Sequence, residues 1–144
     1  MLEIVNETQQ SLPLEGLVRV LETLFEELGV EQTVTLILCS DSFIQDLNLR
    51  DRGVDSPTDV LSYPLIEPDD ATILEIEQLG DIFVSVDTAA RQAEANNVSL
   101  TEELLTLSAH GVRHLQGFDH PTEEAWQTFH KAQKRALELY HEKS

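Results

Sequence analysis

The stretch HGVRHLQGFDH, residues 110 to 120, holds three of the five histidines of this chain. His110 and His114 stand four residues apart within a helical pattern, so their imidazoles project from one helix face, one turn apart. Gly117 predicts a left-handed residue that ends the helix and turns the chain back toward this pair. The reversal brings His120 close to His110 and His114. Three converging imidazoles predict a zinc site with one open position, which is typical of catalytic rather than structural zinc.

Two histidines at helical spacing are common without a metal, but the joint pattern HxxxHxxGxxH is rarely met by chance. The spacing matches the metzincin protease signature HExxHxxGxxH, whose glutamate is the general base. Gly111 stands in place of that glutamate. Because general-base assistance supplies about 10²–10⁴-fold in rate, this argues against ordinary peptide hydrolysis. Asp119 could approach the metal, orient an imidazole or cap the next helix, and its preference for N-cap positions favours a structural role.

Apolar patterns on either side of this stretch predict the remaining elements. Strands are expected at 2–6, 34–39, 56–64 and 80–87, and helices at 14–28, after Ser40 or Asp41, near 87–96, from Ser99 to Gln116, and from Pro121 or Thr122 to His141. Ser99 and Glu102 are spaced as a capping box. Prolines beside the strand at 56–64 indicate a sheet edge. The prediction is one α+β domain over residues 1–144, with a mixed sheet of about four strands covered by helices and the metal motif at a helix C-terminus.

Composition sets further limits. A chain of 144 residues is long enough for one domain with its own core. Cys39 is the only cysteine, so no intramolecular disulfide or thiolate cluster can form, which favours a reducing cytoplasm. The amino terminus lacks a basic region followed by an apolar run, and no segment approaches the length of a membrane span. We therefore expect a soluble, cytoplasmic protein with no membrane partner.

The charge balance complicates any nucleic-acid function. Nine Lys and Arg stand against 27 Asp and Glu, a formal net charge of −18. A field of that sign opposes the approach of nucleic acid or an anionic membrane, although a local patch could still bind. Lys131, Lys134 and Arg135 cluster near the carboxyl end in a pattern typical of a solvated helix face. Trp126, Phe129 and Leu137 fall near helical spacing and favour a core position over a base-stacking platform.

The sequence resembles the YbeY family of metal-dependent endoribonucleases, which take part in ribosomal RNA maturation. Every fixed letter of the family pattern HGxxHLxGxDH is present between residues 110 and 120. The family segment LNxxxRxxDxPTDVLSFP is matched over residues 47–64 with Tyr63 in place of phenylalanine, and LGDIFVS at 79–85 resembles the family's LGDI strand. The resemblance runs from about residue 33 to the carboxyl end. Asp51, where the family often has an aromatic, and Arg113, where it has an apolar or small residue, are departures.

The resemblance implies one zinc ion held by His110, His114 and His120, and a catalytic Arg52 that reaches into the cleft. It further implies a single-strand-specific endoribonuclease that hydrolyses phosphodiester bonds in ribosomal RNA, with a part in 16S rRNA 3′ end processing and in ribosome quality control. The implied partners are precursor ribosomal RNA and the small ribosomal subunit or its proteins. Three histidines also suit nickel, copper or iron.

Several chemical alternatives stay open at this point. Zinc lowers the pKa of a bound water to about 7 and so supplies a nucleophile without a protein base, while a 2′-hydroxyl nucleophile is the alternative. Arg52 offers a planar fork of donors to a phosphate, but its local sequence equally allows a salt bridge with Asp51 or Asp55. Gly111 either leaves room for a nucleotide or packs its helix closely. The strand before Pro64 either lines the cleft or serves only as scaffold. Asp59, in this strand, is a weak candidate for a functional residue.

Two other functions compete with the hydrolase. One is a non-hydrolytic assembly factor for the small ribosomal subunit, in which the metal serves stability. The other is a metalloprotease of unusual mechanism, which Gly111 disfavours. The acidic segment at 67–70 receives no role.

Overall fold

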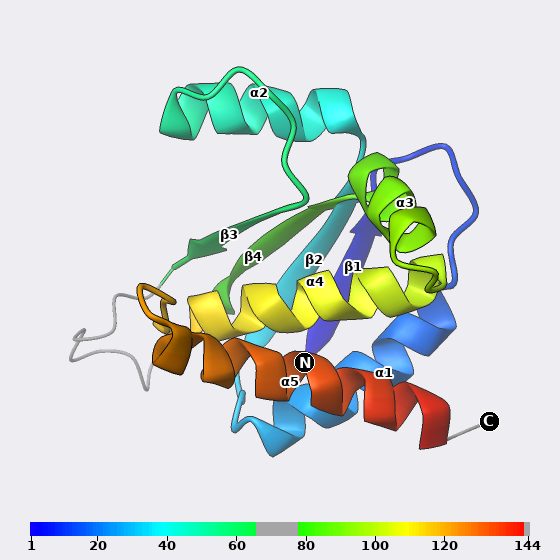
Figure 1. The fold of residues 1–144 in the computed structure, drawn as a ribbon, viewed down its shortest axis with the longest axis vertical. Helices are drawn as coiled ribbons and strands as arrows, with labels where there is room; N and C mark the ends of the chain where they lie inside the picture. Colours follow the sequence, from blue (N-terminus) through cyan, green and yellow to red (C-terminus); the bar gives the residue numbers. More distant parts are fainter. Residues whose placement is uncertain (66–77, 143–144) are drawn as a thin grey trace.

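A computed structural model describes residues 1–65 and 78–142 (Figure 1). The strands are β1 (Leu2–Asn6), β2 (Thr33–Cys39), β3 (Val60–Pro64) and β4 (Gln78–Ser85). The helices are α1 (Leu14–Glu27), α2 (Asp41–Arg52), α3 (Val86–Ala95), α4 (Leu100–Leu115) and α5 (Glu123–Glu142). The acidic segment at 67–70 lies outside the described residues. Among the helices of the described ranges, none combines the length and apolar character needed to cross a bilayer.

The four strands form one mixed sheet in the order β1-β2-β4-β3. β1, β2 and β4 are parallel, and β3 runs antiparallel to β4 at the edge. The predicted α+β class, the four strands and the edge position of the proline-flanked strand are confirmed. β3 begins only at Val60, later than predicted, because the Asp59 carboxylate accepts the Val60 N–H (2.8 Å) and the Ser56 carbonyl accepts from Asn48 (2.9 Å) instead of from a neighbouring strand.

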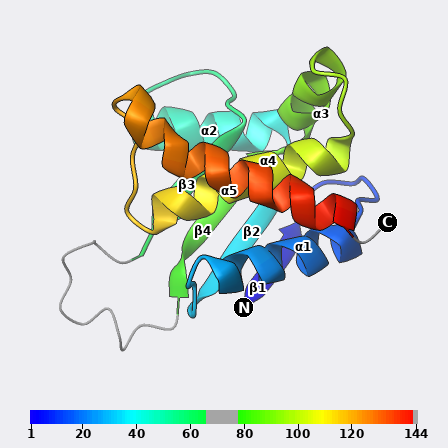
Figure 2. The same ribbon diagram turned by 60° about the horizontal axis from the view of Figure 1, so that its bottom comes forward.

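Helices cover the two faces of the sheet unequally (Figures 1 and 2). α1, α4 and α5 lie over one face, where α4 packs against β3 and β4 and α5 packs on α4. The core between these layers includes Val34, Leu36, Leu38, Ile82 and Val84. On the other face α2 buries Ile44 against Cys39 and Leu61. α4 is thus enclosed between the sheet and two other helices, which fixes the position of the residues at its C-terminal end.

The sequence explains how α4 begins and how closely it packs. The Ser99 hydroxyl accepts the Glu102 N–H (3.1 Å), and the Glu102 carboxylate accepts the Ser99 N–H (2.8 Å), so the predicted capping box is present. Gly111 faces the sheet: a Cβ there would lie 2.7 Å from Ile82 Cγ2. The glycine therefore permits close packing of helix on sheet, which favours the packing alternative over room for a nucleotide.

The end of α4 reverses the chain as the sequence predicts. Gly117 has a φ of +95°, in the left-handed region that glycine adopts without a steric penalty. Its N–H donates to the His114 carbonyl (2.9 Å), and the Phe118 N–H donates to the Arg113 carbonyl (3.1 Å). These two bonds are a Schellman motif. The following residues therefore run back beside the last turns of α4.

Candidate metal centre

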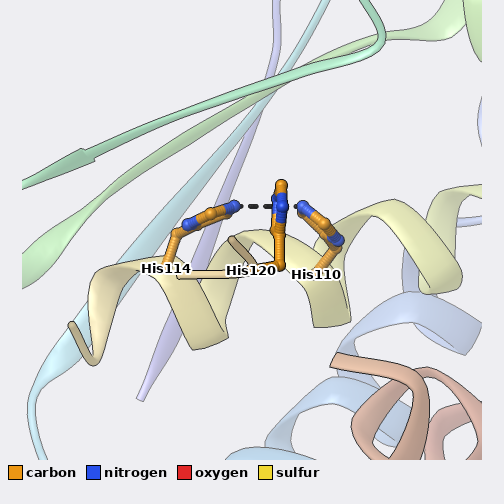
Figure 3. A group of neighbouring side chains, drawn as sticks. All are labelled: His110, His114 and His120. Carbon is orange, nitrogen blue, oxygen red and sulfur yellow. Dashed lines mark hydrogen bonds between the residues drawn. The ribbon is translucent and has the colours of Figure 1, made fainter. Parts of the chain in front are cut away.

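The structure brings the three histidines of the motif together (Figure 3). His110 and His114 project from the last two turns of α4, and His120 reaches between them from the segment after Gly117. One ring nitrogen from each lies within 4.8 Å of the others. The Nε2 atoms of His110 and His114 are 3.1 Å apart. Nitrogen atoms at these separations could hold one metal ion between them after small side-chain adjustments.

A backbone carbonyl fixes the proton position on His114. Its Nδ1 lies 3.1 Å from the carbonyl oxygen of Phe118, which can only accept a hydrogen bond. The proton of the neutral ring therefore belongs on Nδ1, and the lone pair on Nε2 faces the other imidazoles. The Gly117 turn puts the Phe118 carbonyl in this place. The glycine of the motif thus both positions His120 and orients His114.

Gln133 of α5 lies beside Nδ1 of His110, as the Phe118 carbonyl lies beside Nδ1 of His114. Its side-chain amide lies 3.3 Å from His110 Nδ1. The oxygen and nitrogen of a side-chain amide can be exchanged by rotating it through a half-turn. With the oxygen toward the ring, Gln133 accepts a hydrogen bond from the Nδ1–H of His110. The Nε2 lone pair of His110 is then free for a metal. Sequence reasoning missed Gln133, because it lies 23 residues from its partner in the chain.

Aromatic side chains of α5 pack against the three imidazoles. Phe129 is fully buried, as the sequence predicts, and its ring centroid lies 4.7, 4.8 and 5.0 Å from those of His110, His114 and His120. Trp126 is half-buried and stacks on His120 at 3.9 Å with an interplanar angle of 18°. Packing therefore holds all three rings, and hydrogen bonds also hold those of His110 and His114.

Burial keeps the imidazoles of His110 and His114 uncharged. Desolvation, followed by repulsion from His114 and His120, lowers the pKa of His110 to about 4. Desolvation also lowers the pKa of His114, with His120 contributing. At neutral pH both rings are neutral, which is the form that binds a metal. The three nitrogen donors, two of them on rings that are neutral, thus suit a zinc ion.

The three histidines face a cavity of about 540 Å³ that is open to solvent. Its other lining residues come from α2, from β3 and the residue before it, and from the segment after α4: Arg52, Asp59, Val60, Leu61, Ser62, Pro64 and Asp119. The edge strand β3 therefore lines the cleft, one of the two alternatives left open by the sequence. The Ser62 hydroxyl donates to the Gly111 carbonyl (3.3 Å) and ties this strand to α4.

Arg52, the last residue of α2, is exposed and lines the same cavity. The carboxylates that could have paired with it are engaged elsewhere. Asp51 pairs with Arg50 at 3.0 Å, and Asp55 accepts from Gln45 at 2.9 Å. Within residues 1–65 and 78–142, Arg52 has no ion pair. The structure thus favours the cleft alternative over the salt bridge for this guanidinium.

Asp119 has a local structural contact, but not as a helix cap. Its carboxylate accepts the N–H of the adjacent His120 at 2.8 Å. The first turn of α5 is capped instead by Thr122, whose hydroxyl accepts the Ala125 N–H (3.1 Å). The cap role considered for Asp119 was therefore wrong, since α5 begins too late in the sequence for its side chain. Its contact holds the backbone that carries His120.

Arg113, the departure from the family pattern within the motif, stabilises the turn. Its guanidinium lies over the Phe118 ring, 4.3 Å from the centroid, and donates to Gln116 at 2.6 Å. A cation over an aromatic face is attracted to it. This side chain therefore packs on the residue whose carbonyl orients His114, and it does not line the cavity.

Comparison with known proteins agrees with the motif and the fold. The family model described as Endoribonuclease YbeY matches residues 3–141. The chain is 46% identical to Endoribonuclease YbeY of Thermus thermophilus, over 96% of this chain and 100% of that protein. It is 45% identical to the protein of the same name from Deinococcus radiodurans, over 72% of this chain and 73% of that one.

A solved structure shows the same fold. The solution structure of TM1509 from Thermotoga maritima matches with a TM-score of 0.69 and 30% sequence identity, covering 99% of this chain and 93% of that one. The match to the family model spans nearly the whole chain, and the relatives are similar over most of their own length. This chain therefore belongs to the YbeY family.

Proposed function

We propose that this protein is a zinc-dependent endoribonuclease that cleaves single-stranded regions of ribosomal RNA precursors. The observation that carries the proposal is the meeting, in one open cavity, of three imidazoles and the guanidinium of Arg52. A metal site beside a fixed cation suits a reaction in which negative charge develops on phosphoryl oxygens. The relatives named as endoribonucleases supply the substrate class.

Zinc fits the donor set. His110 and His114 would hold it through Nε2, because their Nδ1 atoms face Gln133 and the Phe118 carbonyl, and His120 would be the third ligand. A zinc ion held there supplies Lewis acidity and lowers the pKa of a coordinated water to about 7. The packed rings of Trp126 and Phe129 restrict the imidazoles to this arrangement, so little reorganisation is needed on binding.

Arg52 would bind the phosphate to be cleaved. Its guanidinium presents several N–H donors in one plane, which match two oxygens of a phosphate at once. With Asp51 and Asp55 engaged by other side chains, the guanidinium remains available to an anionic ligand. The donors would stabilise the charge that builds up on the phosphate during cleavage.

Peptide hydrolysis is disfavoured by the packing of Gly111. The protease motif requires a glutamate at this position, and the position faces Ile82 of the sheet so closely that even a Cβ would meet it at 2.7 Å. Among the described residues that line the cavity, the carboxylates are Asp59 and Asp119. Either could accept a proton during cleavage, although both already accept a backbone N–H.

We place this activity in ribosomal RNA maturation in the cytoplasm, including 16S rRNA 3′ end processing and ribosome quality control. The net charge of −18 opposes unaided binding of RNA, so a protein of the small ribosomal subunit would help bring the substrate to the cleft. The same charge is the observation that favours the second candidate, an assembly factor that binds the subunit and does not cleave.

A comparison of four proteins separates the two candidates. The wild type, His114→Ala, Arg52→Ala and Arg19→Ala are each loaded with zinc, their metal content is measured, and each is incubated with single-stranded ribosomal RNA. We expect zinc in all but His114→Ala, and cleavage that falls about 10²-fold or more in Arg52→Ala. Arg19→Ala, the same change on α1 and away from the cavity, should cleave normally. Equal cleavage by Arg52→Ala and wild type would refute the role of Arg52, and no cleavage by zinc-loaded wild type on RNA or on ribosomal particles would favour the assembly factor.

A further inference from the structure

A column of stacked rings leads away from the three histidines along α5. The imidazole of His120 stacks on Trp126 at 3.9 Å and 18°. Trp126 in turn stacks on His130, with centroids 5.4 Å apart and an interplanar angle of 27°. Trp126 is half-buried and His130 is exposed. One end of the column is therefore the candidate metal centre, and the other end is an aromatic ring in solvent.

A second hollow lies beside the exposed end of this column. It has a volume of about 500 Å³ and is lined by Glu123, Trp126, Gln127 and His130. None of these residues lines the larger cavity that holds the three histidines. His120, which lines the larger cavity, contacts Trp126, which lines this one. A ligand longer than the larger cavity would have to cross this contact to enter the second hollow.

The distribution of cations indicates the charge of such a ligand. Arg50, Arg91 and Arg135 are ion-paired with carboxylates. Lys131 and Lys134 are exposed on α5 and form no ion pair with any residue in the part of the chain that the structure describes. Lys134 stands four residues after His130, one turn along the same helix face. Glu123 lines the hollow itself, but in so acidic a chain an unpaired lysine one turn from an exposed aromatic ring favours an anionic partner.

We propose that His130 and Trp126 form a base-stacking subsite for the RNA substrate, next to the cleavage site. A base of the bound strand would stack on the exposed ring of His130 and extend the column, and Lys134 would neutralise a neighbouring phosphate. Rings that stack on bases, beside cations that follow the backbone, are the general means of binding single strands. The bases of a duplex already stack on one another, so the subsite selects unpaired RNA. This inference rests on the proposed endoribonuclease activity.

The protein reports on this subsite directly, because Trp126 is its only tryptophan. The zinc-loaded full chain is titrated with a nuclease-resistant 2′-O-methyl single-stranded RNA, and indole fluorescence is followed. Binding of a base next to the column is expected to change the emission of Trp126. The same strand annealed to its complement, and inorganic polyphosphate as a probe of charge alone, should produce little or no change.

Variants at His130 separate stacking from structure. Base–aromatic contacts are worth about 5-fold or more in affinity, so His130→Ala should weaken RNA binding by at least that factor. His130→Tyr should restore it, because a phenol ring also stacks. His141→Ala is the matched control: it removes an exposed histidine at the other end of α5, which contacts Glu102, and should bind RNA as the wild type does. Zinc content should be equal in all of these proteins.

Two results would overturn the subsite. The first is RNA binding by the wild type with no change in indole emission and with equal affinity for His130→Ala. The second is equal weakening in His130→Ala and His130→Tyr, which would indicate a role of the imidazole other than stacking. Metal-dependent cleavage by the wild type alongside either result leaves the proposed activity intact. Failure of cleavage, with binding that depends on His130, refutes the activity and keeps the subsite.

Discussion

Two groups other than the fixed residues of the HxxxHxxGxxH motif face the outer nitrogens of its first two imidazoles. The Phe118 carbonyl lies 3.1 Å from His114 Nδ1, and the Gln133 amide lies 3.3 Å from His110 Nδ1. Partners of this kind fix the tautomer and the ring orientation of metal ligands. Gln133 would therefore be a positioning residue, which acts on the metal only through His110.

Replacement of Gln133 tests this role. Gln133→Leu keeps the approximate volume and removes the hydrogen bond, and we expect zinc affinity to fall by about 10–100-fold. Competition with a chromophoric chelator measures the change. Gln127→Leu, on the same helix but outside contact with the three imidazoles, serves as the control and should leave zinc affinity unaltered. Equal affinities for Gln133→Leu and the wild type would show that packing alone orients His110.

The lowered pKa values of His110 and His114 predict how the metal-free protein responds to acid. The pKa of His110 is about 4 in the folded state, below the ordinary histidine value of about 6.5. Between these values the unfolded chain binds more protons than the folded one. The stabilising contribution of neutral His110 is therefore complete above about pH 6.5 and is lost as the pH falls toward 4.

Chemical denaturation of two metal-free proteins over this pH range provides the measurement. Burial, and then Asp59, raises the pKa of Glu103, which changes stability with pH in the opposite direction. A comparison of the wild type with His110→Gln cancels this effect, because both proteins contain Glu103. The wild type should lose stability relative to the variant as the pH falls from neutral to 4. A difference that stays constant with pH would contradict the low pKa of His110.

At the scale of elements, close approaches between backbones set the shape of the cleft. Gly80 of β4 pairs with Pro64 of β3, and a Cβ at Gly80 would lie 2.5 Å from the Tyr63 carbonyl oxygen and 2.8 Å from Leu115 Cδ2. The glycine of the LGDI segment thus lets the edge strand and the end of α4 meet β4 closely. Both elements contribute residues to the cavity.

Alanine substitutions at two glycines should therefore have opposite effects. Gly80→Ala forces a backbone carbonyl aside and should destabilise the protein by about 1–3 kcal/mol. Gly16→Ala lies in α1, where a Cβ meets nothing within 4 Å, and should stabilise the protein by about 0.5–1 kcal/mol because alanine is the better helix former. Thermal or urea unfolding measures both. A Gly80→Ala protein as stable as the wild type would refute the close approach of β3.

Local patterns predicted the elements well, because their signals lie within a few residues. The spacing of His110 and His114, the left-handed Gly117 and the capping box of Ser99 each depend on one helix or one turn. The strand order and the contact between Gln133 and His110 depend on how elements pack, which no local pattern contains. Asp119 was assigned the wrong contact for a local reason, since both it and Thr122 are good N-cap residues and only Thr122 precedes the first turn.

For the whole molecule, the question is how a chain of net charge −18 would bind an anionic strand. Arg52 lines the cleft, Lys131 and Lys134 follow His130 on α5, and within the described ranges none of the three is ion-paired. Three unpaired cations can make only a few contacts with the phosphates of an RNA strand. Affinity would then depend on stacking, on the metal and on a ribosomal partner more than on the charge of the protein.

The salt dependence of RNA binding should accordingly be shallow. Each phosphate contact on a single strand contributes about −0.7 to the slope of log K against log salt, so three contacts give about −2. Lys134→Gln should reduce the slope by one contact, whereas Arg19→Gln, the same charge change on α1, should not. A slope several times steeper in the wild type would mean that many other cations contact the RNA.

The most direct test of the central claim is a titration of zinc into the metal-free protein while cleavage of single-stranded ribosomal RNA is followed. The account predicts that activity rises in proportion to added zinc and reaches a plateau at one ion per chain, that a chelator abolishes it, and that His120→Ala recovers no activity under the same loading. Cleavage that does not depend on zinc, or that persists in His120→Ala at the wild-type rate, would contradict a catalytic metal held by the three histidines.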